Sequence, residues 1–242
     1  MSAVSDIAWR IHHKQETAST NLDAREGRHG DVFTADYQTA GRGRLNHKWL
    51  SPPKTNLMMS VVLSVEGLSP EHVSTLPLVV GLSVVKALSL LLSASTFPIK
   101  LKWPNDVLID GKKIAGILCE RNDGNVIAGI GVNVGQTDFP PEIVAGATSL
   151  ALVAARGGVV TVRDAILAEL ARRHSLWRTG GFVAVYPEIT VVDFLKGREI
   201  SVRQTDDDAA PLVGVSGGIL QDGSLDVGGK RAYAGEAHVE RT

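Results

Sequence analysis

The chain has 242 residues, of which 44% are hydrophobic and 21% are charged, an ordinary composition for a soluble globular protein. Its 25 lysine and arginine residues nearly balance its 26 aspartate and glutamate residues, which excludes a general electrostatic attraction to nucleic acid or to an anionic membrane. Cys119 is the only cysteine, which excludes an internal disulfide and fits a reducing compartment such as the cytoplasm.

The N-terminal segment predicts neither a targeting signal nor a nucleic-acid-binding domain. Residues 1–14 contain no apolar core of a signal peptide, and the polar stretch 1–15 is too short for a DNA-binding domain, so we expect no DNA partner. Ser19, Thr20 and Asn21 then precede a short helical pattern, a position where such residues cap a helix. The same hydroxyl and amide groups would equally suit the polar head of a small ligand, so both interpretations stay open.

The middle of the chain predicts strands on either side of one long helix. Apolar patterns predict strands over residues 32–37, 56–65, 99–103, 107–109, 114–119 and 125–134. The apolar run between the second and third of these strands, about residues 70–93, carries Lys86 in its middle, and its most apolar part is short for a membrane span. It therefore predicts a mostly buried core helix, and we expect no membrane partner.

The rest of the chain predicts helices and then a small domain of strands. A helix is expected to begin at a capping pattern, Thr161 to Asp164, and to end at Gly180-Gly181, and residues 182–195 are expected to be partly helical. Short apolar pieces between turn residues then predict a β-barrel, with Asp206-Asp207-Asp208 at a solvated hairpin tip. We therefore expect an α+β fold, with a mixed, largely antiparallel sheet and packed helices over residues 1–195 and a small C-terminal β-barrel domain over residues 196–242.

A loop rich in glycine and arginine follows the first of these predicted strands. The segment Gly41–Arg44 contains two glycines and two arginines and is followed by Trp49. Glycine lets a ligand approach the backbone closely, and arginine offers a planar charged fork for carboxylate and phosphate oxygens. Tryptophan offers a flat face on which a base can stack. A solvated surface loop is the alternative, and these residues alone leave both interpretations open.

Two further stretches place polar residues and glycine near strand ends. Asn105 and Asp106 follow Pro104 in a turn that can orient a substrate or help hold Mg²⁺, although an ordinary Asx-type turn has the same residues. Lys113 precedes Gly116 within a predicted strand. The glycine indicates close approach of a ligand or of another backbone, whereas the alternative for the lysine is an edge-strand position that deters aggregation.

Together these stretches resemble the biotin–protein ligases (biotin–[biotin carboxyl carrier protein] ligases). The resemblance is carried, in family order, by Ser19-Thr20-Asn21, Gly41-Arg-Gly-Arg44 with Trp49, Lys102-Trp-Pro-Asn-Asp106, Lys113-Ile-Ala-Gly-Ile-Leu118 and Gly129-Ile-Gly-Val-Asn133. It extends from about Thr17 to the end, and Leu45-Asn46-His47 departs from it, since the family often has a glycine and more basic residues there. It implies a class II synthetase-like catalytic core, an SH3-like C-terminal barrel, and a short form without the N-terminal DNA-binding domain.

The resemblance also implies an activity and the residues that carry it. The activity is ATP-dependent conversion of biotin to biotinyl-5′-AMP with release of pyrophosphate, then transfer of biotin to a lysine of a biotin carboxyl carrier protein domain in a biotin-dependent carboxylase. Biotin would meet Ser19, Thr20, Asn21, Gln38, Gly41, Arg42, Gly43, Arg44, Lys113, Gly116 and Gly129. ATP would meet Arg44, Trp49, Asn105, Lys113, Gly131, Val132 and Asn133. Catalysis would fall to Arg42, Arg44, Lys113 and Asp106, with Mg²⁺ on Asn105 and Asp106.

The charges of these residues suit that chemistry. Joining a carboxylate to the α-phosphate of ATP brings two anions together, so it needs fixed positive charge more than an acid or a base. One alternative is a lipoate–protein ligase, although the arginine and three-glycine run that this family tends to show is absent from the sequence. The other alternative is a biotin-responsive binding or regulatory protein. A homodimer through an exposed sheet edge is a further expectation.

Overall fold

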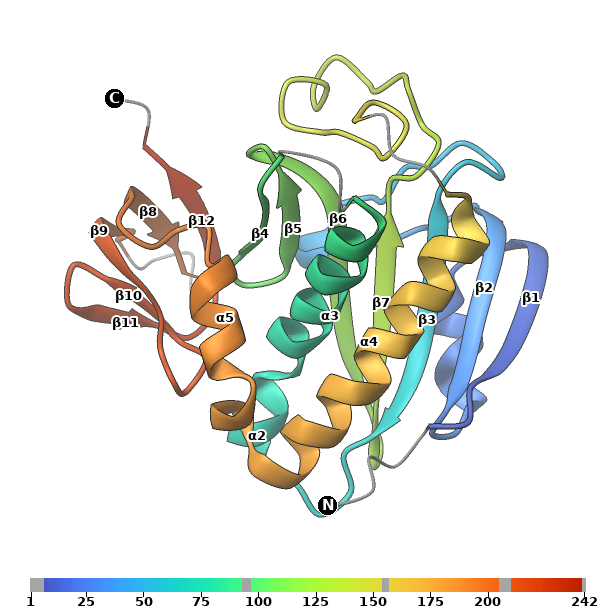
Figure 1. Cartoon of the computed structure of the whole chain (residues 1–242), viewed down its shortest axis with the longest axis horizontal. Coiled ribbons are helices and arrows are strands. Elements are labelled where there is room, and N and C mark those ends of the chain that lie inside the picture. The colour runs from blue at the N-terminus through green and yellow to red at the C-terminus, as the bar shows by residue number, and fades with distance from the viewer. Residues whose placement is uncertain (1–6, 93–96, 154–156, 205–209, 241–242) are drawn as a thin grey trace.

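The computed structural model describes residues 7–92, 97–153, 157–204 and 210–240. Asp206-Asp207-Asp208, expected at a hairpin tip, lies outside the described residues. The described chain forms one large sheet with helices packed on it and a second, smaller sheet near the C-terminus (Figure 1). The expected α+β fold is therefore confirmed.

The large sheet has seven strands in the order β1-β2-β3-β7-β6-β5-β4. In chain order they are β1 (Arg10–Thr17), β2 (Asp31–Gln38), β3 (Leu57–Ser64), β4 (Ile99–Lys102), β5 (Asp106–Ile109), β6 (Lys112–Asn122) and β7 (Asn125–Val132). β1 and β2 are parallel, and the other neighbouring strands are antiparallel. Asp110 and Gly111 both take positive φ, 50° and 76°, which is the backbone that a two-residue hairpin between β5 and β6 requires.

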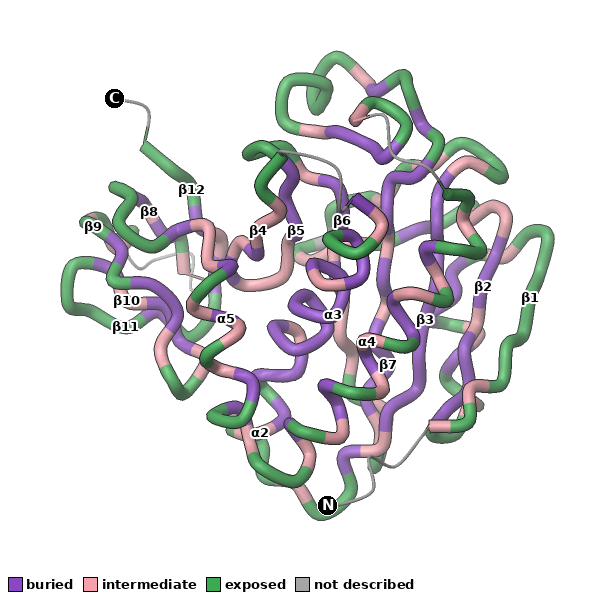
Figure 2. The backbone as a smooth tube through the Cα atoms, viewed as in Figure 1, coloured by how far each residue is buried: buried purple, intermediate pink, exposed green. Residues whose placement is uncertain are grey.

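The edge strand β1 was not predicted, because residues 10–17 carry no strand pattern in the sequence. Every residue of β1 is exposed except Thr17, which is half-buried, so the strand carries no apolar alternation that a sequence pattern would reveal (Figure 2). Polar contacts hold it on β2 instead, among them a bond of 2.7 Å from Arg10 Nε to Asp31 Oδ1. The strand therefore depends on its pairing with β2 and leaves an exposed edge on the sheet.

Helices α2 (Pro70–Ser74), α3 (Leu76–Leu91), α4 (Val159–Gly180) and α5 (Tyr186–Val192) lie on one face of the sheet (Figure 1). The stretch 70–91 has the length and hydropathy of a membrane-spanning helix, but 72% of its most apolar 18 residues is buried inside the molecule. The expected buried helix is confirmed, with a break at Thr75 between α2 and α3. α4 ends at Gly180 as expected, but it begins at Val159 and Gly158 is its N-cap, so the capping pattern at Thr161 was wrong.

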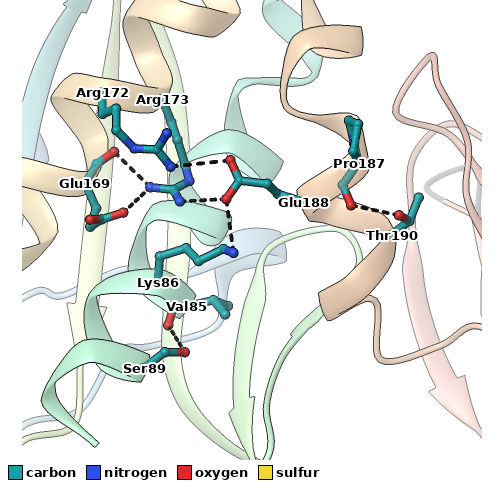
Figure 3. A network of polar contacts seen from close by, with 9 residues as sticks. All are labelled: Val85, Lys86, Ser89, Glu169, Arg172, Arg173, Pro187, Glu188 and Thr190. Carbon is teal, nitrogen blue, oxygen red and sulfur yellow. Dashed lines mark hydrogen bonds and ion pairs between the residues drawn. The ribbon is translucent and has the colours of Figure 1, made fainter. Parts of the chain in front are cut away.

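An ion network joins α3, α4 and α5 (Figure 3). Arg173 of α4 is 1% exposed and donates to the carboxylates of Glu169 and Glu188, the second at 2.8 Å. Lys86 Nζ of α3 lies 3.0 Å from Glu188 Oε2. Burial opposes ionisation of Glu188, but hydrogen bonds from Arg173 and Lys86 outweigh it and lower the pKa of this carboxyl. Because a buried charge without its partner is strongly destabilising, the network fixes α5 on the other two helices.

The small sheet follows α5 in the chain. Its strands are β8 (Glu199–Arg203), β9 (Leu212–Ile219), β10 (Leu225–Val227), β11 (Lys230–Ala232) and β12 (Glu236–Val239), in the antiparallel order β11-β10-β9-β8-β12. The two strands expected within residues 213–220 form the single strand β9, and β11 was not expected. Trp103 Nε1 donates to the carbonyl of Gly223 at 3.1 Å, and Tyr186 Oη donates to the carbonyl of Ile219 at 3.0 Å. These bonds fix the small sheet beside the end of β4.

Candidate functional site

A cavity of about 780 Å³ lies on the face of the large sheet opposite the core helices. Ile117, Ile130 and Val132 of β6 and β7 face the core, and the residues that alternate with them form the floor of the cavity: Gly116, Leu118, Gly129 and Gly131. The structure brings to this cavity nearly all of the residues singled out in the sequence: Ser19, Thr20, Asn21, Gln38, Arg42, Gly43, Arg44, Trp49, Asn105, Asp106, Lys113, Gly116, Gly129, Gly131 and Asn133.

Two of the singled-out residues do not line the cavity. The side chain of Val132 is fully buried in the core. Gly41 supports the loop instead, because its carbonyl accepts the N–H of Trp49 at 3.0 Å. A Cβ atom at Gly41 would lie 2.6 Å from the carbonyl oxygen of Trp49, so only glycine fits this close approach.

One end of the cavity is a cluster of buried hydroxyl and amide groups. Ser19 is the N-cap of α1 (Thr20–Asp23), but its side chain makes no capping hydrogen bond. Ser19, Thr20 and Asn21 are 3 to 4% exposed. The N–H of Thr20 donates to Gln38 Oε1 at 2.7 Å, and Ser60 Oγ of β3 lies 2.6 Å from Asn21 Oδ1. Ser19 therefore occupies the N-cap position without a capping bond from its side chain, and the side chains of the three residues form a polar cluster suited to the head of a small ligand.

The glycines of β7 make room for side chains that lie across the strand. A Cβ atom at Gly129 would collide with Asn21 Oδ1. A Cβ atom at Gly131 would lie 2.5 Å from Trp49 Cε2, and one at Gly116 would lie 3.3 Å from Trp49 Cζ3. Trp49 Nε1 is buried with no hydrogen-bond partner in the described part of the chain, so it remains available to a ligand acceptor. On the floor, Gly129 thus makes room for Asn21, and Gly131 makes room for the indole of Trp49.

The arginine-containing loop crosses the cavity towards the small sheet. Arg44 Nη1 donates to Asn105 Oδ1 at 3.3 Å and to the carbonyl of Gly235 at 3.2 Å. Burial lowers the pKa of Arg44, and the carboxylates of Asp106 and Glu236 oppose that shift. The departing segment Leu45-Asn46-His47 forms a tight turn in which Leu45 has a φ of 51°, and the N–H of Gly43 donates to the His47 carbonyl at 2.7 Å. A positive φ at leucine is strained, which indicates that this turn is held by its surroundings.

Cationic side chains gather at the opposite end of the cavity from the polar cluster. Lys113 Nζ lies 2.7 Å from Asp106 Oδ1. β6 lies between β7 and β5, so the alternative of an aggregation-deterring edge lysine at Lys113 was wrong. Burial lowers the pKa of Lys102, with Asp106 and Glu236 opposing and Lys113 adding to the shift. Such a group of cations is suited to binding carboxylate and phosphate oxygens.

The oxygen donors considered for Mg²⁺ are both engaged by cationic side chains. Asn105 Oδ1 accepts from Arg44, and Asp106 pairs with Lys113. The described residues contain no group of three or more histidine, cysteine, aspartate or glutamate side chains that would hold a metal ion. One carboxylate and one amide oxygen fit Mg²⁺ that is carried largely by substrate phosphates and water, which is how this ion is commonly bound at phosphoryl-transfer sites.

Several cavity residues were not singled out from the sequence. They are Lys102, Glu142, Glu236 and His238, and Ser60 supports the lining from outside it through its bonds to Thr20 and Asn21. Lys102 belongs to a stretch that carried the resemblance, and Ser60 is a lone hydroxyl within an apolar strand, so each gave a weak signal. Glu236 and His238 gave none, because they reach the cavity from β12 only through the packing of the small sheet on the large one.

The family model and the curated relatives that match this chain all concern protein ligases. Residues 8–136 match the model of the biotin/lipoate A/B protein ligase family. A biotin–[acetyl-CoA-carboxylase] ligase of Mycobacterium tuberculosis is 36% identical over 178 residues, which cover 70% of this chain and 66% of that protein. The corresponding ligase of Paracoccus denitrificans is 32% identical over 182 residues, which cover 70% of this chain and 75% of that protein. The bifunctional ligase/repressor BirA of Bacillus subtilis is 36% identical over 167 residues, which cover 64% of this chain and 49% of that protein.

Solved structures extend the likeness over the whole fold. The biotin protein ligase from Aquifex aeolicus in complex with biotin and ATP matches with a TM-score of 0.81 and 28% identity, covering 96% of this chain and 99% of that chain. The biotin protein ligase from Leishmania major in complex with biotin matches with a TM-score of 0.66 and 25% identity, over 89% and 96% of the two chains. Among the curated relatives named first, the matched part spans only about half to two thirds of each protein's length.

Proposed function

Because this chain belongs to the biotin/lipoate A/B protein ligase family, we propose that it activates biotin with ATP and transfers the biotin to a protein lysine. In the first step a carboxylate oxygen of biotin attacks the α-phosphorus of ATP, and pyrophosphate leaves. In the second step the lysine amine attacks the carbonyl of biotinyl-5′-AMP, and AMP leaves. The observation that carries the proposal is one cavity with a neutral polar cluster at one end and Arg44, Lys102 and Lys113 at the other.

The polar cluster suits the ureido head of biotin. Ser19, Thr20 and Asn21 are buried at the cavity wall, where hydrogen bonds to a neutral head group replace water without the cost of burying a charge. Biotin bound there would extend its carboxylate along the floor over Gly129 and Gly116 towards Lys113. Arg42 and Gly43 stand on the loop above this path.

ATP is assigned to the part of the cavity that lies over Gly131. The indole of Trp49 lies against this glycine and offers its face to adenine. Asn133 is 6% exposed, and its Nδ2 donates to the Thr148 carbonyl at 3.0 Å, which leaves its amide oxygen for the nucleotide. The phosphates would then meet Arg44, Lys113 and Asn105.

Catalysis in this proposal depends on fixed charge. Arg42, Arg44 and Lys113 neutralise the two anions that must approach each other, and their positions on a sheet and an anchored loop require little reorganisation during the reaction. Asp106 orients Lys113 and later the acceptor lysine. Mg²⁺ bound with the ATP phosphates would supply further charge neutralisation, with Asn105 and Asp106 as its protein oxygen donors.

The proposed acceptor is a biotin carboxyl carrier protein domain of a biotin-dependent carboxylase, since the relatives described above are named for acetyl-CoA carboxylase. We assign the catalytic unit to residues 1–195 and propose that residues 196–242 help to close the cavity. The bond of Arg44 to Gly235 and the lining residues Glu236 and His238 support this role. A homodimer would form through the exposed edge at β1, and we place the reaction in the cytoplasm.

ATP–pyrophosphate exchange tests the reaction. We expect exchange that depends on biotin, followed by biotin transfer to a purified carrier domain. Exchange supported by lipoate and not by biotin would identify the lipoate–protein ligase alternative and overturn the proposal. A protein that binds biotin without any exchange would be the regulatory alternative, and salt-sensitive specific binding to promoter DNA in a gel shift would support that outcome.

A further inference from the structure

We propose that Glu120, a residue outside the cavity, is a positioning residue that decides which atoms of Asn21 face the ligand head group. This inference rests on the proposed binding of the biotin head at Asn21. Glu120 belongs to β6, its side chain is 32% exposed, and it does not line the cavity. Its Oε2 accepts a hydrogen bond from Asn21 Nδ2 at 2.6 Å, and its Oε1 accepts one from Arg42 Nη2 at 3.4 Å.

The carboxylate fixes the orientation of the Asn21 amide. An ionised carboxylate only accepts hydrogen bonds, so the NH₂ group of Asn21 must be the one that faces Glu120. The same NH₂ group donates to the carbonyl of Leu118 at 3.4 Å, so both of its hydrogens have acceptors within the protein. Asn21 Oδ1 is therefore the atom that lies over Gly129 on the cavity floor.

This orientation continues into the neighbouring hydroxyl groups. Ser60 Oγ lies 2.6 Å from Asn21 Oδ1 and 2.7 Å from Thr20 Oγ1. A hydroxyl has one hydrogen and an amide oxygen can only accept, so the Ser60 hydrogen goes to Asn21, and the Thr20 hydrogen stays within the cluster, on Ser60 or on Gln38 Oε1, which lies 3.1 Å away. The cluster then offers oxygen acceptors to the cavity. A ureido head group, which carries two N–H donors beside its carbonyl, complements that arrangement.

Glu120 needs both of its oxygens for this task. Its two neighbours, Asn21 and Arg42, are donors, and each takes a separate carboxylate oxygen. Glutamine has the same shape but only one acceptor oxygen, so it would turn an NH₂ group against one of the two donors. Where that NH₂ group faces Asn21, the Asn21 amide gains by rotating, and it presents its own NH₂ group to the N–H donors of the ligand. An unmatched donor of this kind costs more than the lost bond itself.

The test compares Glu120→Gln with a matched control, Glu26→Gln, which makes the same change of charge at an exposed residue outside the cavity lining. Calorimetric titration with biotin should show affinity lower by about 10-fold for Glu120→Gln, the effect of losing one hydrogen bond to a charged group. At saturating biotin, its KM for ATP should stay within about twofold of wild type, since independent sites do not couple. Glu26→Gln should bind biotin as wild type does.

A double-mutant cycle shows whether Glu120 acts through Asn21. In an Asn21→Ala background, Glu120→Gln should change biotin affinity by less than about twofold, because the amide that it orients is gone. Equal losses for biotin and ATP, additive effects in the cycle, or unchanged biotin affinity of Glu120→Gln would each overturn the inference. Wild-type protein that binds no biotin would instead refute the proposed function, so the two failures are distinguishable.

Discussion

Lys113 Nζ lies 2.7 Å from Asp106 Oδ1, and this ion pair joins two adjacent strands at the floor of the cavity. Lys113 extends from β6 and Asp106 begins β5, so the strand pairing itself aims the lysine. In the proposed reaction, a cation held in this way meets the carboxylate of biotin and the α-phosphate without being ordered first.

Replacing Lys113 by alanine tests this charge. We expect Lys113→Ala to lower the rate of adenylation by on the order of 100-fold or more, the scale for one lost transition-state contact to a developing charge. Pyrophosphate exchange at saturating biotin and ATP measures the rate. Lys112→Ala is the control, because Lys112 is the exposed neighbour on the same strand. Exchange by Lys113→Ala at the wild-type rate would show that the lysine has only a structural role.

Arg44 links the loop above the cavity to the small sheet through its bonds to Asn105 and Gly235. Arg44→Gly removes both bonds, so the loop should open more often and release biotinyl-5′-AMP faster, on the order of 10-fold or more for hydrogen bonds from a charged group. Released intermediate labels lysines of unrelated proteins, and labelling of a bystander protein without a carrier domain measures it. A variant that keeps the intermediate as tightly as wild type would contradict the closing role of Arg44.

Substitutions at the two glycines of β7 should each affect the binding of a different ligand. Gly129→Ala places a methyl group against Asn21, and Gly131→Ala places one against the ring of Trp49. We expect Gly129→Ala to weaken biotin binding and Gly131→Ala to raise the KM for ATP, each by roughly 10-fold, since overpacking costs about 1–3 kcal/mol. Gly124→Ala is the control, because a Cβ atom there meets no atom within 4 Å. The same loss of both ligands in both variants would contradict separate subsites.

His174 should make the stability of the protein fall in acid. It is 2% exposed, and burial lowers its pKa to about 4, with the nearby His29 and Arg178 adding to the shift. In the unfolded chain a histidine has a pKa of about 6.5, and above that pH His174 is neutral in both the folded and the unfolded protein. As the pH falls from there towards 4, the unfolded state takes up a proton that the folded state resists, so stability is lost.

The expected loss is roughly 3 kcal/mol between about pH 7 and pH 4, and urea unfolding at several pH values measures it. His174→Gln cannot take up the proton, so its stability should fall less over the same range. His47→Gln, a change at an exposed histidine, should keep the wild-type pH dependence. If His174→Gln kept it as well, His29, whose pKa burial also lowers, or the carboxylates would be the source of the acid sensitivity.

Much of the fold could be predicted because its signals are local. The buried run of α3, the hairpin at Asp110-Gly111 and the helix end at Gly180 each follow from apolar content or from backbone freedom within a few residues. β1 could not be predicted, since it is polar on both faces and exists through its pairing with β2. The start of α4 at Val159 likewise differs from its capping pattern, because packing overrides a weak local preference.

The sequence by itself determined which chemical groups this protein carries and their order: hydroxyls and an amide at residues 19–21, arginines in a glycine loop, and Lys113 ahead of a glycine strand. Only the tertiary structure decided how they meet. The pairing of β6 with β7 sets Gly116 beside Gly131, and the packing of the small sheet brings Glu236 to Arg44. Glu120 reaches Asn21 across nearly one hundred positions of the chain. Such contacts depend on non-local packing and register, which no short stretch of residues encodes.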